Sequence, residues 1–425
     1  MWNNIVDELE WRGLVYQSTP LDQLKERLKE GPVTLYAGFD PTADSLHIGH
    51  LIPILGLRRF QQAGNKVICV VGGATALLGD PSGKEAEREL SADELVKNWA
   101  VIFEEQLSQY LDFSGDNAAL MTNNYDWIST ISAFEYLREI GKKFSVNVMV
   151  TKESVKRRLQ DPDKGISYTE FSYMVMQAFD YFILNERHNC ELQIGGSDQW
   201  GNITAGMDLI WKKKNKKVHC MTFPLIQTAD GKKIGKTEAG TVWLDKKRTS
   251  PYELYQYWLN VDDRDVIKFL KFYTFLPKEE IEELEAIHNS DPGRRVAHKK
   301  LAEEVTSLIH GREEMLGAVA ASKALFGEAE ITEIGESTLQ SLCDTTPSVA
   351  LSSSEAIPSL VDLLVLAGFY TSKGAARRDL TGGGIYFNNQ RISDPEFTPK
   401  AEDLLFGKYF VLRKGKKNFK PGFYK

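Results

Sequence analysis

A change of hydrophobic period between residues 33 and 73 constrains the fold of this chain more than any other feature. An apolar, strand-like run at Val33–Phe39 follows Gly31-Pro32, a helical pattern covers about residues 46–62, and Lys66–Gly73 has the pattern of a second buried strand. A strand, a crossover helix and a buried parallel strand form a right-handed βαβ unit. The pattern predicts an α/β protein with a Rossmann-like parallel sheet of the kind that binds nucleotides.

The chain has 425 residues, which is too long for one compact core and indicates two or three domains. We expect a Rossmann-like domain over residues 1–248, with a more mixed stretch at about 125–165 that we interpret as an insertion. Acid-rich helical patterns predict an α-helical domain at 249–344. Residues 345–356 have the composition of a linker, and residues 357–425 are expected to form a small α+β domain.

The charge of the chain is unevenly distributed. The formal net charge is −7, and this value alone argues against a general nucleic-acid binder. Residues 407–425, however, hold seven basic side chains and no acidic one, so the other 406 residues carry −14. The sequence therefore predicts an acidic body with a basic end that can contact a polyanion locally.

Membrane and metal classes find little support in the sequence. No run of 18 apolar residues occurs, so no membrane-spanning helix is expected. The start of the chain lacks the basic residues and the apolar run of a signal peptide. Four cysteines are too few for a disulfide framework, so we expect a cytoplasmic protein. One candidate zinc site consists of His188, Cys190, His219 and Cys220. Their spacing matches no usual zinc-binding pattern, so we expect no zinc bound by the protein.

The tetrapeptide His47-Ile48-Gly49-His50 follows the first strand and opens the first crossover helix. A helix N-terminus offers unpaired backbone N–H groups and a partial positive charge, and both attract phosphates. Two imidazoles three residues apart lie on neighbouring faces and can donate hydrogen bonds to phosphate oxygens. Gly49 lets a flat base or ribose approach the backbone. The alternative is a pair of solvated histidines at a helix start, without a ligand.

A second motif, Lys232-Lys233-Ile234-Gly235-Lys236-Thr237, lies nearly 190 residues downstream. Two ammonium groups on either side of a glycine can hold a triphosphate and then the developing pyrophosphate. Gly235 gives such a loop the freedom to close. The P-loop pattern is absent at this motif, and an ordinary solvated lysine-rich loop is the alternative.

The two motifs, in this order, resemble those of the class I aminoacyl-tRNA synthetases, and the residues around them resemble the bacterial tyrosyl-tRNA synthetases. The resemblance covers essentially the whole chain in the family's order. Two departures are found: the second motif keeps both lysines but not the methionine and the two serines of the family, and Ala37 stands where some relatives carry cysteine. The stretches that carry the resemblance are residues 35–50, 79–84, 168–173 and 195–202.

The resemblance implies an enzyme that joins L-tyrosine to tRNA(Tyr). In the first step the tyrosine carboxylate attacks the α-phosphate of ATP, supplied with Mg²⁺, and gives tyrosyl-adenylate and pyrophosphate. In the second step the 3′-terminal adenosine of the tRNA takes the tyrosyl group. The resemblance also implies a homodimer, with the insertion at 125–165 as the expected contact.

A tyrosine pocket can be assigned from both chemistry and the resemblance. A phenol both donates and accepts a hydrogen bond, and we assign Tyr36 and Asp180 to it. The spacing of Tyr173, Gln177 and Asp180 is i, i+4, i+7, which places them on one helical face; the alternative for this helix is plain core. Phenylalanine has no hydroxyl, so it would leave Tyr36 and Asp180 without a hydrogen-bond partner on the substrate. The side chains expected around the substrate ammonium are Asp80, Tyr173 and Gln177.

The nucleotide and catalytic residues follow from the two motifs and from the resemblance. Thr42 and His47 are assigned to the β- and γ-phosphates, and His50 to the ribose and α-phosphate. Lys84 and Arg88 can reach pyrophosphate, although an ion pair with a neighbouring glutamate is the alternative for Arg88. The ATP-binding set is Gly38, Asp40, Thr42, His47, Gly49, His50, Lys84, Arg88, Asp198, Gln199 and Lys236, and the catalytic set is His47, His50, Lys233, Lys236 and Thr237.

The last domain resembles a small RNA-binding module shared with a ribosomal small-subunit protein. Arginines on a helix there can meet phosphates, with a solvated basic tail as the alternative. The acidic helical domain is expected to present only a few side chains to the anticodon. The candidates for tRNA contact are Trp200, Lys212, Lys213, Arg377, Arg378, Lys414, Lys416 and Lys417.

Three rival functions remain open at this point. A tryptophan-specific relative would have to accommodate an indole, which only donates a hydrogen bond, so the Tyr36–Asp180 pair would need another purpose. A nucleotidyltransferase would leave about the last 170 residues without a role. An RNA-binding protein without activity would not need the pocket carboxylates and the phosphate motifs together.

Overall fold

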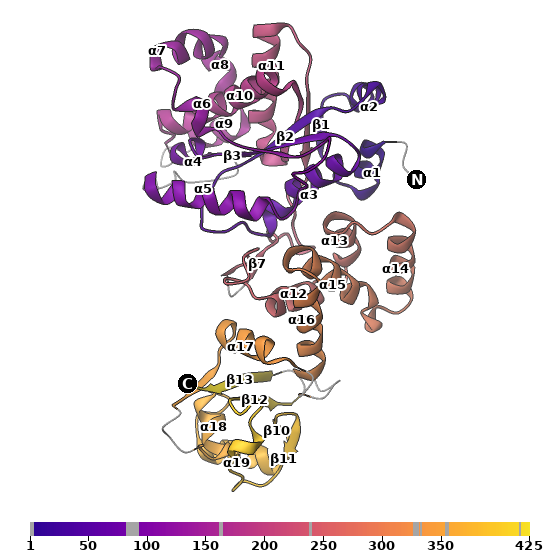
Figure 1. Ribbon diagram of the computed structural model, residues 1–425, viewed down its shortest axis with the longest axis vertical. Helices are drawn as coiled ribbons and strands as arrows, with labels where there is room; N and C mark the ends of the chain where they lie inside the picture. The colour runs from indigo at the N-terminus through magenta and orange to yellow at the C-terminus, as the bar shows by residue number, and fades with distance from the viewer. Residues whose placement is uncertain are drawn as a thin grey trace. The chain divides into compact units, whose positions relative to one another are not determined.

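The computed structural model describes residues 4–81, 93–160, 165–237, 240–325, 331, 334–352, 357–415 and 418–425. The chain forms two compact units (Figure 1). Unit 1 comprises Met1–Trp243 with Lys271–Phe275, and unit 2 comprises Leu244–Leu270 with Leu276–Lys425. The finer domain boundaries expected from the sequence stay a prediction. Within the described ranges, no helix is both long and apolar enough to cross a membrane.

The core of unit 1 is a mostly parallel sheet, which confirms the predicted fold class. Its strand order is β1-β6-β5-β2-β3-β4, and only the edge strand β1 runs antiparallel to its neighbour. The central strand β2 pairs with β3 on one side and β5 on the other, so Tyr36 lies between Ile68 and Gln193. The strands are β1 (Gln17–Ser18), β2 (Thr34–Phe39), β3 (Lys66–Val71), β4 (Leu120–Asn123), β5 (Cys190–Gly196) and β6 (His219–Phe223).

Helix α3 (Ile48–Gln62) makes the predicted crossover between β2 and β3 and is buried along most of its length. Helix α10 (Tyr168–His188) begins where the Ser167 hydroxyl accepts a hydrogen bond from the backbone N–H of Glu170, and it ends at Asn189, which has a left-handed backbone. It packs against α11 (Trp200–Lys214). The other helices of unit 1 are α1 (Ile5–Arg12), α2 (Leu21–Glu30), α4 (Thr75–Leu78), α5 (Asp93–Leu107), α6 (Tyr125–Ile128), α7 (Ala133–Glu135), α8 (Val146–Met149) and α9 (Glu153–Gln160).

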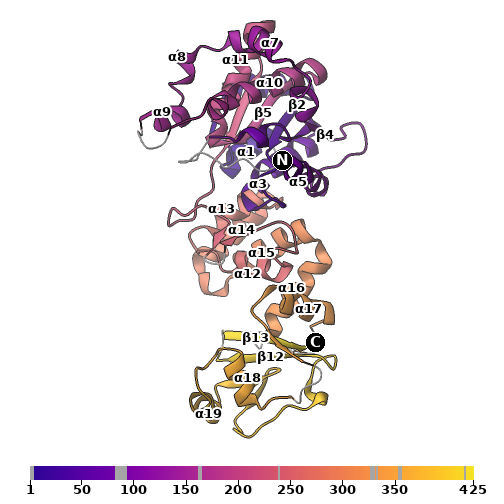
Figure 2. The ribbon, with the colours of Figure 1, turned by 90° about the vertical axis from the view of Figure 1, so that its left-hand side faces the viewer.

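The stretch interpreted as an insertion consists of short helices, and Figure 2 shows α8 and α9 at the periphery of unit 1. Several large apolar side chains of this stretch and of the start of α10 are 53–73% exposed. They are Phe134, Leu137, Val146, Val148, Leu159 and Tyr168.

Unit 2 begins with a set of helices. Helix α12 (Pro251–Leu259) starts with a capping box, in which Ser250 and Glu253 satisfy each other's backbone N–H groups. Its Trp258 is fully buried. The remaining helices are α13 (Val266–Tyr273), α14 (Lys278–Ser290), α15 (Val296–His310), α16 (Arg312–Leu325) and α17 (Glu336–Thr345).

Unit 2 also contains a five-stranded sheet of order β11-β10-β12-β13-β9, which agrees with the expected α+β character. Ile385 and Phe387 face a core shared with two helices. Residues 349–351, within the expected linker, form a strand that pairs in parallel with residues 422–424, and it buries Val349 and Leu351 while Ala350 is exposed. The elements are β9 (Val349–Leu351), α18 (Leu360–Leu366), α19 (Lys373–Thr381), β10 (Ile385–Phe387), β11 (Gln390–Ile392), β12 (Tyr409–Lys414) and β13 (Asn418–Tyr424).

Candidate active site

The first part of the site is a buried pair of polar groups beside the central strand. Tyr36 of β2 is buried, and its hydroxyl has no hydrogen-bond partner among the described residues. Asp180 of α10 is also buried, and it accepts hydrogen bonds from Trp127 Nε1 at 2.7 Å and Asn124 Nδ2 at 3.1 Å. Burial, with a smaller contribution from the charge of Asp180, raises the pKa of Tyr36 well above its usual value. An unpaired hydroxyl near a buried carboxyl group can bind a ligand that both donates and accepts, as a phenol does.

Neither Asn124 nor Trp127 was predicted from the sequence. They follow β4, and neither belongs to a motif. The Asn124 side chain also accepts a hydrogen bond from the backbone N–H of Ala74 at 2.9 Å, so its amide orientation is fixed from both sides. One feature of the sequence could have indicated Asn124: it is a polar residue directly after the carboxyl end of a parallel strand. Ligands of open α/β sheets bind at this end.

The pH dependence of ligand binding at Asp180 can be predicted from its burial. Burial raises the pKa of Asp180 to about 7, against the lowering effect of its bonds to Asn124 and Trp127. Below pH 7 the carboxyl is therefore protonated in the folded chain and has one acceptor fewer for a phenol. We expect the affinity for tyrosine to fall up to about tenfold per pH unit below this pKa. Equilibrium dialysis between about pH 6 and 8.5 measures it.

Asp180→Asn is the matched control for this pH dependence, because it cannot ionise. Its tyrosine affinity should be nearly flat over the same range, and an unchanged slope in Asp180→Asn would assign the effect to another group. The sign for stability follows from the same shift. The folded chain keeps the proton of Asp180 up to about pH 7, whereas the unfolded chain loses it near pH 4. The free energy of unfolding therefore falls as pH rises from about 4 to 7.

A hydrogen-bonded chain continues from Asn124 to Asp40, a residue expected from the sequence to bind ATP. Asn124 Nδ2 donates to Thr75 Oγ1 at 2.9 Å, and Thr75 Oγ1 donates to Asp40 Oδ1 at 2.7 Å. The Tyr173 hydroxyl donates to Asp40 Oδ2 at 2.7 Å. Gly72 is required here, because an added Cβ would lie 1.9 Å from Asp40 Oδ1. The structure thus joins a residue expected to bind tyrosine, Tyr173, directly to one expected to bind ATP, Asp40.

A second hydrogen-bonded group joins the remaining pocket residues. Gln199 Nε2 donates to Asp80 Oδ2 at 2.7 Å. Asn202 Nδ2 of α11 bonds both Gln199 Oε1 at 3.1 Å and Gln177 Oε1 at 3.2 Å. Burial, followed by the charge of Asp80, raises the pKa of the neighbouring Asp198. Asp80 and Gln177, which are expected to bind tyrosine, and Gln199, which is expected to bind ATP, therefore lie in one hydrogen-bonded group. Asn202 joins this group and was not predicted from the sequence.

The paired histidines stack on each other at the start of α3. Their ring centroids are 3.9 Å apart at an interplanar angle of 19°. Gly49 N donates to His47 Nδ1 at 3.0 Å, and His47 N donates to His50 Nδ1 at 3.2 Å. Because Nδ1 is the acceptor in both rings, a neutral ring carries its hydrogen on Nε2. Burial, followed by the proximity of His47, lowers the pKa of His50 well below its usual value, which favours that neutral form.

The structure gives a second reason for glycine at position 49, besides the close approach of a ligand that the sequence led us to expect. A Cβ at this position would lie 2.8 Å from His47 Cε1, closer than real Cβ contacts. The His47 ring folds back over the first turn and caps the helix. Gly49 therefore makes room for the His47 ring, whether or not a ribose also approaches.

The second motif, residues 232–237, which we call the lysine loop, lies against the start of α3. Nearly 190 residues separate it from the paired histidines in the sequence. Ile48 N donates to Val242 O at 3.2 Å, and His47 forms a backbone bridge with Trp243. Gly235 has φ of +77° and its Cα faces Ile48, since an added Cβ would lie 3.3 Å from Ile48 Cγ2. Both motifs, each expected from the sequence to bind phosphate, thus occupy one region of unit 1.

The lysine loop is a small hairpin. Strand β7 (Lys236–Thr237) pairs with β8 (Gly240–Thr241), and Lys233 is exposed. The side chains of Lys236 and Thr237, and all of Lys84, Arg88, Lys416 and Lys417, lie outside what the structure describes. Gly38 and Thr42 lie at the end of β2 and just after it.

The candidate tRNA residues of unit 1 have partners within the protein. Trp200 begins α11 and packs against the core beneath it. Lys212 Nζ donates to Lys143 O at 2.9 Å, and Lys213 Nζ lies 3.5 Å from Glu139 O. These lysines hold the 139–143 segment, so a contact with tRNA stays a prediction.

The candidate tRNA residues of unit 2 are more accessible. Arg377 and Arg378 of α19 line an open depression together with Glu396, which lies 3.6 Å from Arg377. Lys414 lies over the Tyr370 ring at 4.0 Å and 3.5 Å from Asp379. An arginine-lined depression on a helix can receive a phosphate.

The cysteines lie in the core. All four are buried and free, and the thiols of Cys190 and Cys220 donate to the backbone carbonyls of Leu192 and Ile203. In the described part of the chain, no three His, Cys, Asp or Glu side chains come together as metal ligands.

Comparisons with known proteins agree over the whole chain. The family "tRNA synthetases class I (W and Y)" matches residues 28–327, and "Tyrosine--tRNA ligase SYY-like C-terminal domain" matches residues 338–420. The chain is 52% identical over 418 residues to a tyrosine–tRNA ligase of Geobacillus stearothermophilus, which covers 98% of each chain. It is 51% identical over 416 residues to one of Streptomyces avermitilis, covering 98% of this chain and 97% of the relative.

Solved structures point the same way. The chain is similar to a C-terminally truncated mitochondrial tyrosyl-tRNA synthetase of Aspergillus nidulans, with a TM-score of 0.69, 32% identity, and coverage of 76% of this chain and 94% of that one. The chain therefore belongs to the class I aminoacyl-tRNA synthetases, within the family of the bacterial tyrosine–tRNA ligases.

Proposed function

We propose that the chain activates L-tyrosine with ATP and transfers the tyrosyl group to tRNA(Tyr). The observation that carries this proposal is the buried, unpaired hydroxyl of Tyr36 close to the buried carboxyl of Asp180. A phenol satisfies both groups, whereas phenylalanine leaves both unpaired, at about 1–3 kcal/mol each. The connected groups around Asp40, Asp80 and Gln177 provide acceptors for the substrate ammonium.

The first step needs positioning and charge stabilisation rather than a covalent enzyme intermediate. An oxygen of the tyrosine carboxylate forms a bond to the α-phosphorus of ATP, and the bond from that phosphorus to the pyrophosphate oxygen breaks. The Nε2–H groups of His47 and His50 donate to phosphate oxygens. Lys233 and Lys236 balance the charge of the departing pyrophosphate, and Mg²⁺ arrives with ATP, bound through its phosphates.

In the second step, a hydroxyl of the 3′-terminal adenosine attacks the tyrosyl carbonyl carbon. The ester bond to the tRNA forms, the mixed anhydride breaks and AMP leaves. We assign Arg377, Arg378 and Lys414 to the tRNA phosphates, supported by the exposure of the two arginines and by the basic end of the chain. The salt dependence of tRNA binding should reflect these contacts.

We further propose that the protein acts as a homodimer in the cytoplasm. The exposed apolar side chains between residues 134 and 168 support the dimer, because a second copy of the chain can cover them isologously. Four free thiols, all buried, fit a reducing compartment.

Amino-acid-dependent exchange of pyrophosphate into ATP tests this function. The full chain should catalyse exchange with tyrosine and at a far lower rate with tryptophan or phenylalanine. Tyr36→Phe removes only one hydroxyl and should narrow the preference for tyrosine over phenylalanine by about tenfold. Exchange with tryptophan alone would favour a tryptophan-specific enzyme, and binding of tRNA without exchange by any amino acid would favour an RNA-binding protein.

A further inference from the structure

Three adjacent parallel strands of unit 1 end in register. The last residues of β2, β3 and β4 pair with one another across the sheet. Asp40, Gly72 and Asn124 come directly after these strands, so they lie next to one another at the carboxyl edge of the sheet. Ligands of open α/β sheets bind at this edge. Side chains that connect Asp40 with Asn124 are therefore well placed to act on a bound substrate.

The hydroxyl of Thr75, the first residue of α4, connects them. Its oxygen accepts from Asn124 Nδ2 at 2.9 Å and donates to Asp40 Oδ1 at 2.7 Å. Thr75 is 2% exposed and Asn124 is 1% exposed, so bulk solvent does not reach either residue. Gly72 leaves the space for this contact, because an added Cβ would lie 2.5 Å from Thr75 Oγ1 and 1.9 Å from Asp40 Oδ1. The backbone is thus shaped around the bond between Thr75 and Asp40.

The hydrogens of this group have a defined direction. Asn124 Oδ1 accepts from the backbone N–H of Ala74 at 2.9 Å, which fixes the orientation of the amide. The amide nitrogen then donates to Asp180 and to Thr75. A hydroxyl has only one hydrogen. Because the Thr75 oxygen accepts from Asn124, its own hydrogen is directed to the carboxylate of Asp40.

The other oxygen of Asp40 sets the direction of the Tyr173 hydroxyl. This hydroxyl donates to Asp40 Oδ2 at 2.7 Å. Burial, followed by the charge of Asp40, raises the pKa of Tyr173 well above its usual value, so the phenol keeps its hydrogen. A phenol whose hydrogen is given to Asp40 offers lone pairs to a substrate, and an ammonium group can only donate. Asp40 therefore holds Tyr173 in the state that suits the substrate ammonium expected beside it.

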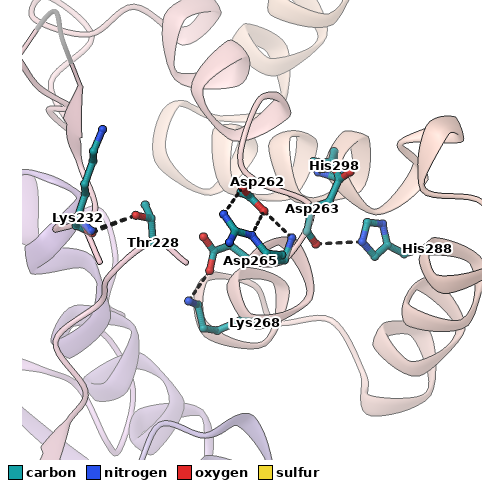
Figure 3. A network of polar contacts seen from close by, with 9 residues as sticks. Thr228, Lys232, Asp262, Asp263, Asp265, Lys268, His288 and His298 are labelled. Atoms are coloured by element: carbon teal, nitrogen blue, oxygen red, sulfur yellow. Dashed lines mark hydrogen bonds and ion pairs between the residues drawn. The ribbon is translucent and has the colours of Figure 1, made fainter. Parts of the chain in front are cut away.

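A polar network of unit 2 shows how this group differs from one that closes a turn. Arg264 donates to Asp262 at 2.8 Å, and Lys268 Nζ donates to Asp265 Oδ1 at 2.5 Å (Figure 3). These partners are two or three residues apart, and the cationic side chains are 60% and 38% exposed. The bonds of unit 1 instead join residues 35, 49 and 133 positions apart. Of the two networks, only that of unit 1 contains residues expected to bind tyrosine or ATP.

We propose that Thr75 is a positioning residue for recognition of the substrate ammonium. Its hydroxyl holds Asp40 in the orientation in which both carboxylate oxygens accept, and Asp40 in turn holds Tyr173 as an acceptor for the ammonium. Asn124 keeps its bond to Asp180 when the hydroxyl of Thr75 is removed, so the phenol end of the pocket does not depend on Thr75. This inference rests on the proposed function, which supplies tyrosine as the substrate.

The test compares two ligands that differ by the ammonium group, L-tyrosine and its deamino analogue para-hydroxyphenylpropionate. Thr75→Val removes the hydroxyl and keeps the shape of the side chain, whereas Thr75→Ser keeps the hydroxyl. Thr222→Val is the matched control, because Thr222 of β6 is also buried and its hydroxyl bonds the backbone of Gln17. Equilibrium dialysis gives the affinity of each full-length variant for both ligands, and pyrophosphate exchange gives kcat and KM for tyrosine.

In Thr75→Val we expect the affinity for tyrosine to fall about tenfold and that for the deamino analogue to stay within about twofold, because only the ammonium end loses a hydrogen bond. KM for tyrosine should rise in parallel while kcat stays within about threefold, as for a contact made equally in ground state and transition state. Thr75→Ser should restore the affinity for tyrosine, and Thr222→Val should keep both affinities of the parent.

Equal losses for the two ligands in Thr75→Val would mean that the whole pocket is damaged, and this result would overturn the proposal. An unchanged affinity for tyrosine in Thr75→Val, or a Thr75→Ser variant as weak as Thr75→Val, would also overturn it. If Thr75→Val does not fold, Thr75→Ala decides by the same ratio of affinities. Absence of tyrosine-dependent exchange in the parent chain would instead contradict the proposed function, and this inference with it.

Discussion

Asp180→Ala is expected to lower kcat/KM for tyrosine in pyrophosphate exchange by about 10³-fold. The substitution leaves the substrate phenol and the donors of Trp127 and Asn124 without their acceptor. Each buried unpaired polar group costs about 1–3 kcal/mol, and a total near 4 kcal/mol corresponds to this factor. Steady-state exchange with tyrosine and with phenylalanine measures the effect.

The comparison between substrates distinguishes a lost contact from a damaged pocket. Phenylalanine lacks the hydroxyl, so its kcat/KM should fall much less than that of tyrosine. Trp127→Phe is the matched control, because it removes one donor to Asp180 and keeps an aromatic ring; a loss of about tenfold is expected. If kcat/KM fell equally for tyrosine and phenylalanine in Asp180→Ala, Asp180 would not contact the hydroxyl of the substrate.

His47→Ala should lower kcat for exchange by about 10²–10³-fold and change KM for tyrosine and ATP little. This is the usual cost of removing one donor that acts on charge developing in the transition state. The donor in question is Nε2–H, since Nδ1 of His47 accepts from Gly49 N at 3.0 Å. Exchange kinetics over a range of ATP concentrations give kcat and KM separately.

The control for His47 separates catalysis from helix capping. His47 is the N-cap of α3, and asparagine is among the best N-cap residues. His47→Asn should therefore restore the thermal stability lost in His47→Ala but not its rate. If His47→Asn restored kcat as well, the role of His47 would be to cap the helix rather than to bind phosphate.

Helical spacing predicted that three polar side chains share one face of a helix. Tyr173, Gln177 and Asp180 lie on α10 at the expected spacing, because a helix repeats every 3.6 residues and places i, i+4 and i+7 on one side. Their partners could not be predicted in the same way. Tyr173 bonds Asp40, 133 residues away, and Gln177 bonds Asn202 on another helix.

The βαβ pattern likewise predicted the central strands and the crossover helix, because a buried strand and a buried helix face have different periods. It did not predict β4, where Asn124 and Trp127 follow a strand with no fully buried residue. Nor did it predict that the lysine loop lies against Ile48, since a long connection carries no periodicity that indicates its contacts.

The sequence by itself determined which side chains share a helix face, which strands are buried, where a phosphate can meet a helix start and to which family the motifs point. All of these depend on local spacing and on residue chemistry. Only the tertiary structure decided that Trp127 holds Asp180, 53 residues away, and that Arg59 holds Thr274, 215 residues away. Such pairs depend on strand order and on the packing of elements around one core, and neither is encoded in the period of any single segment.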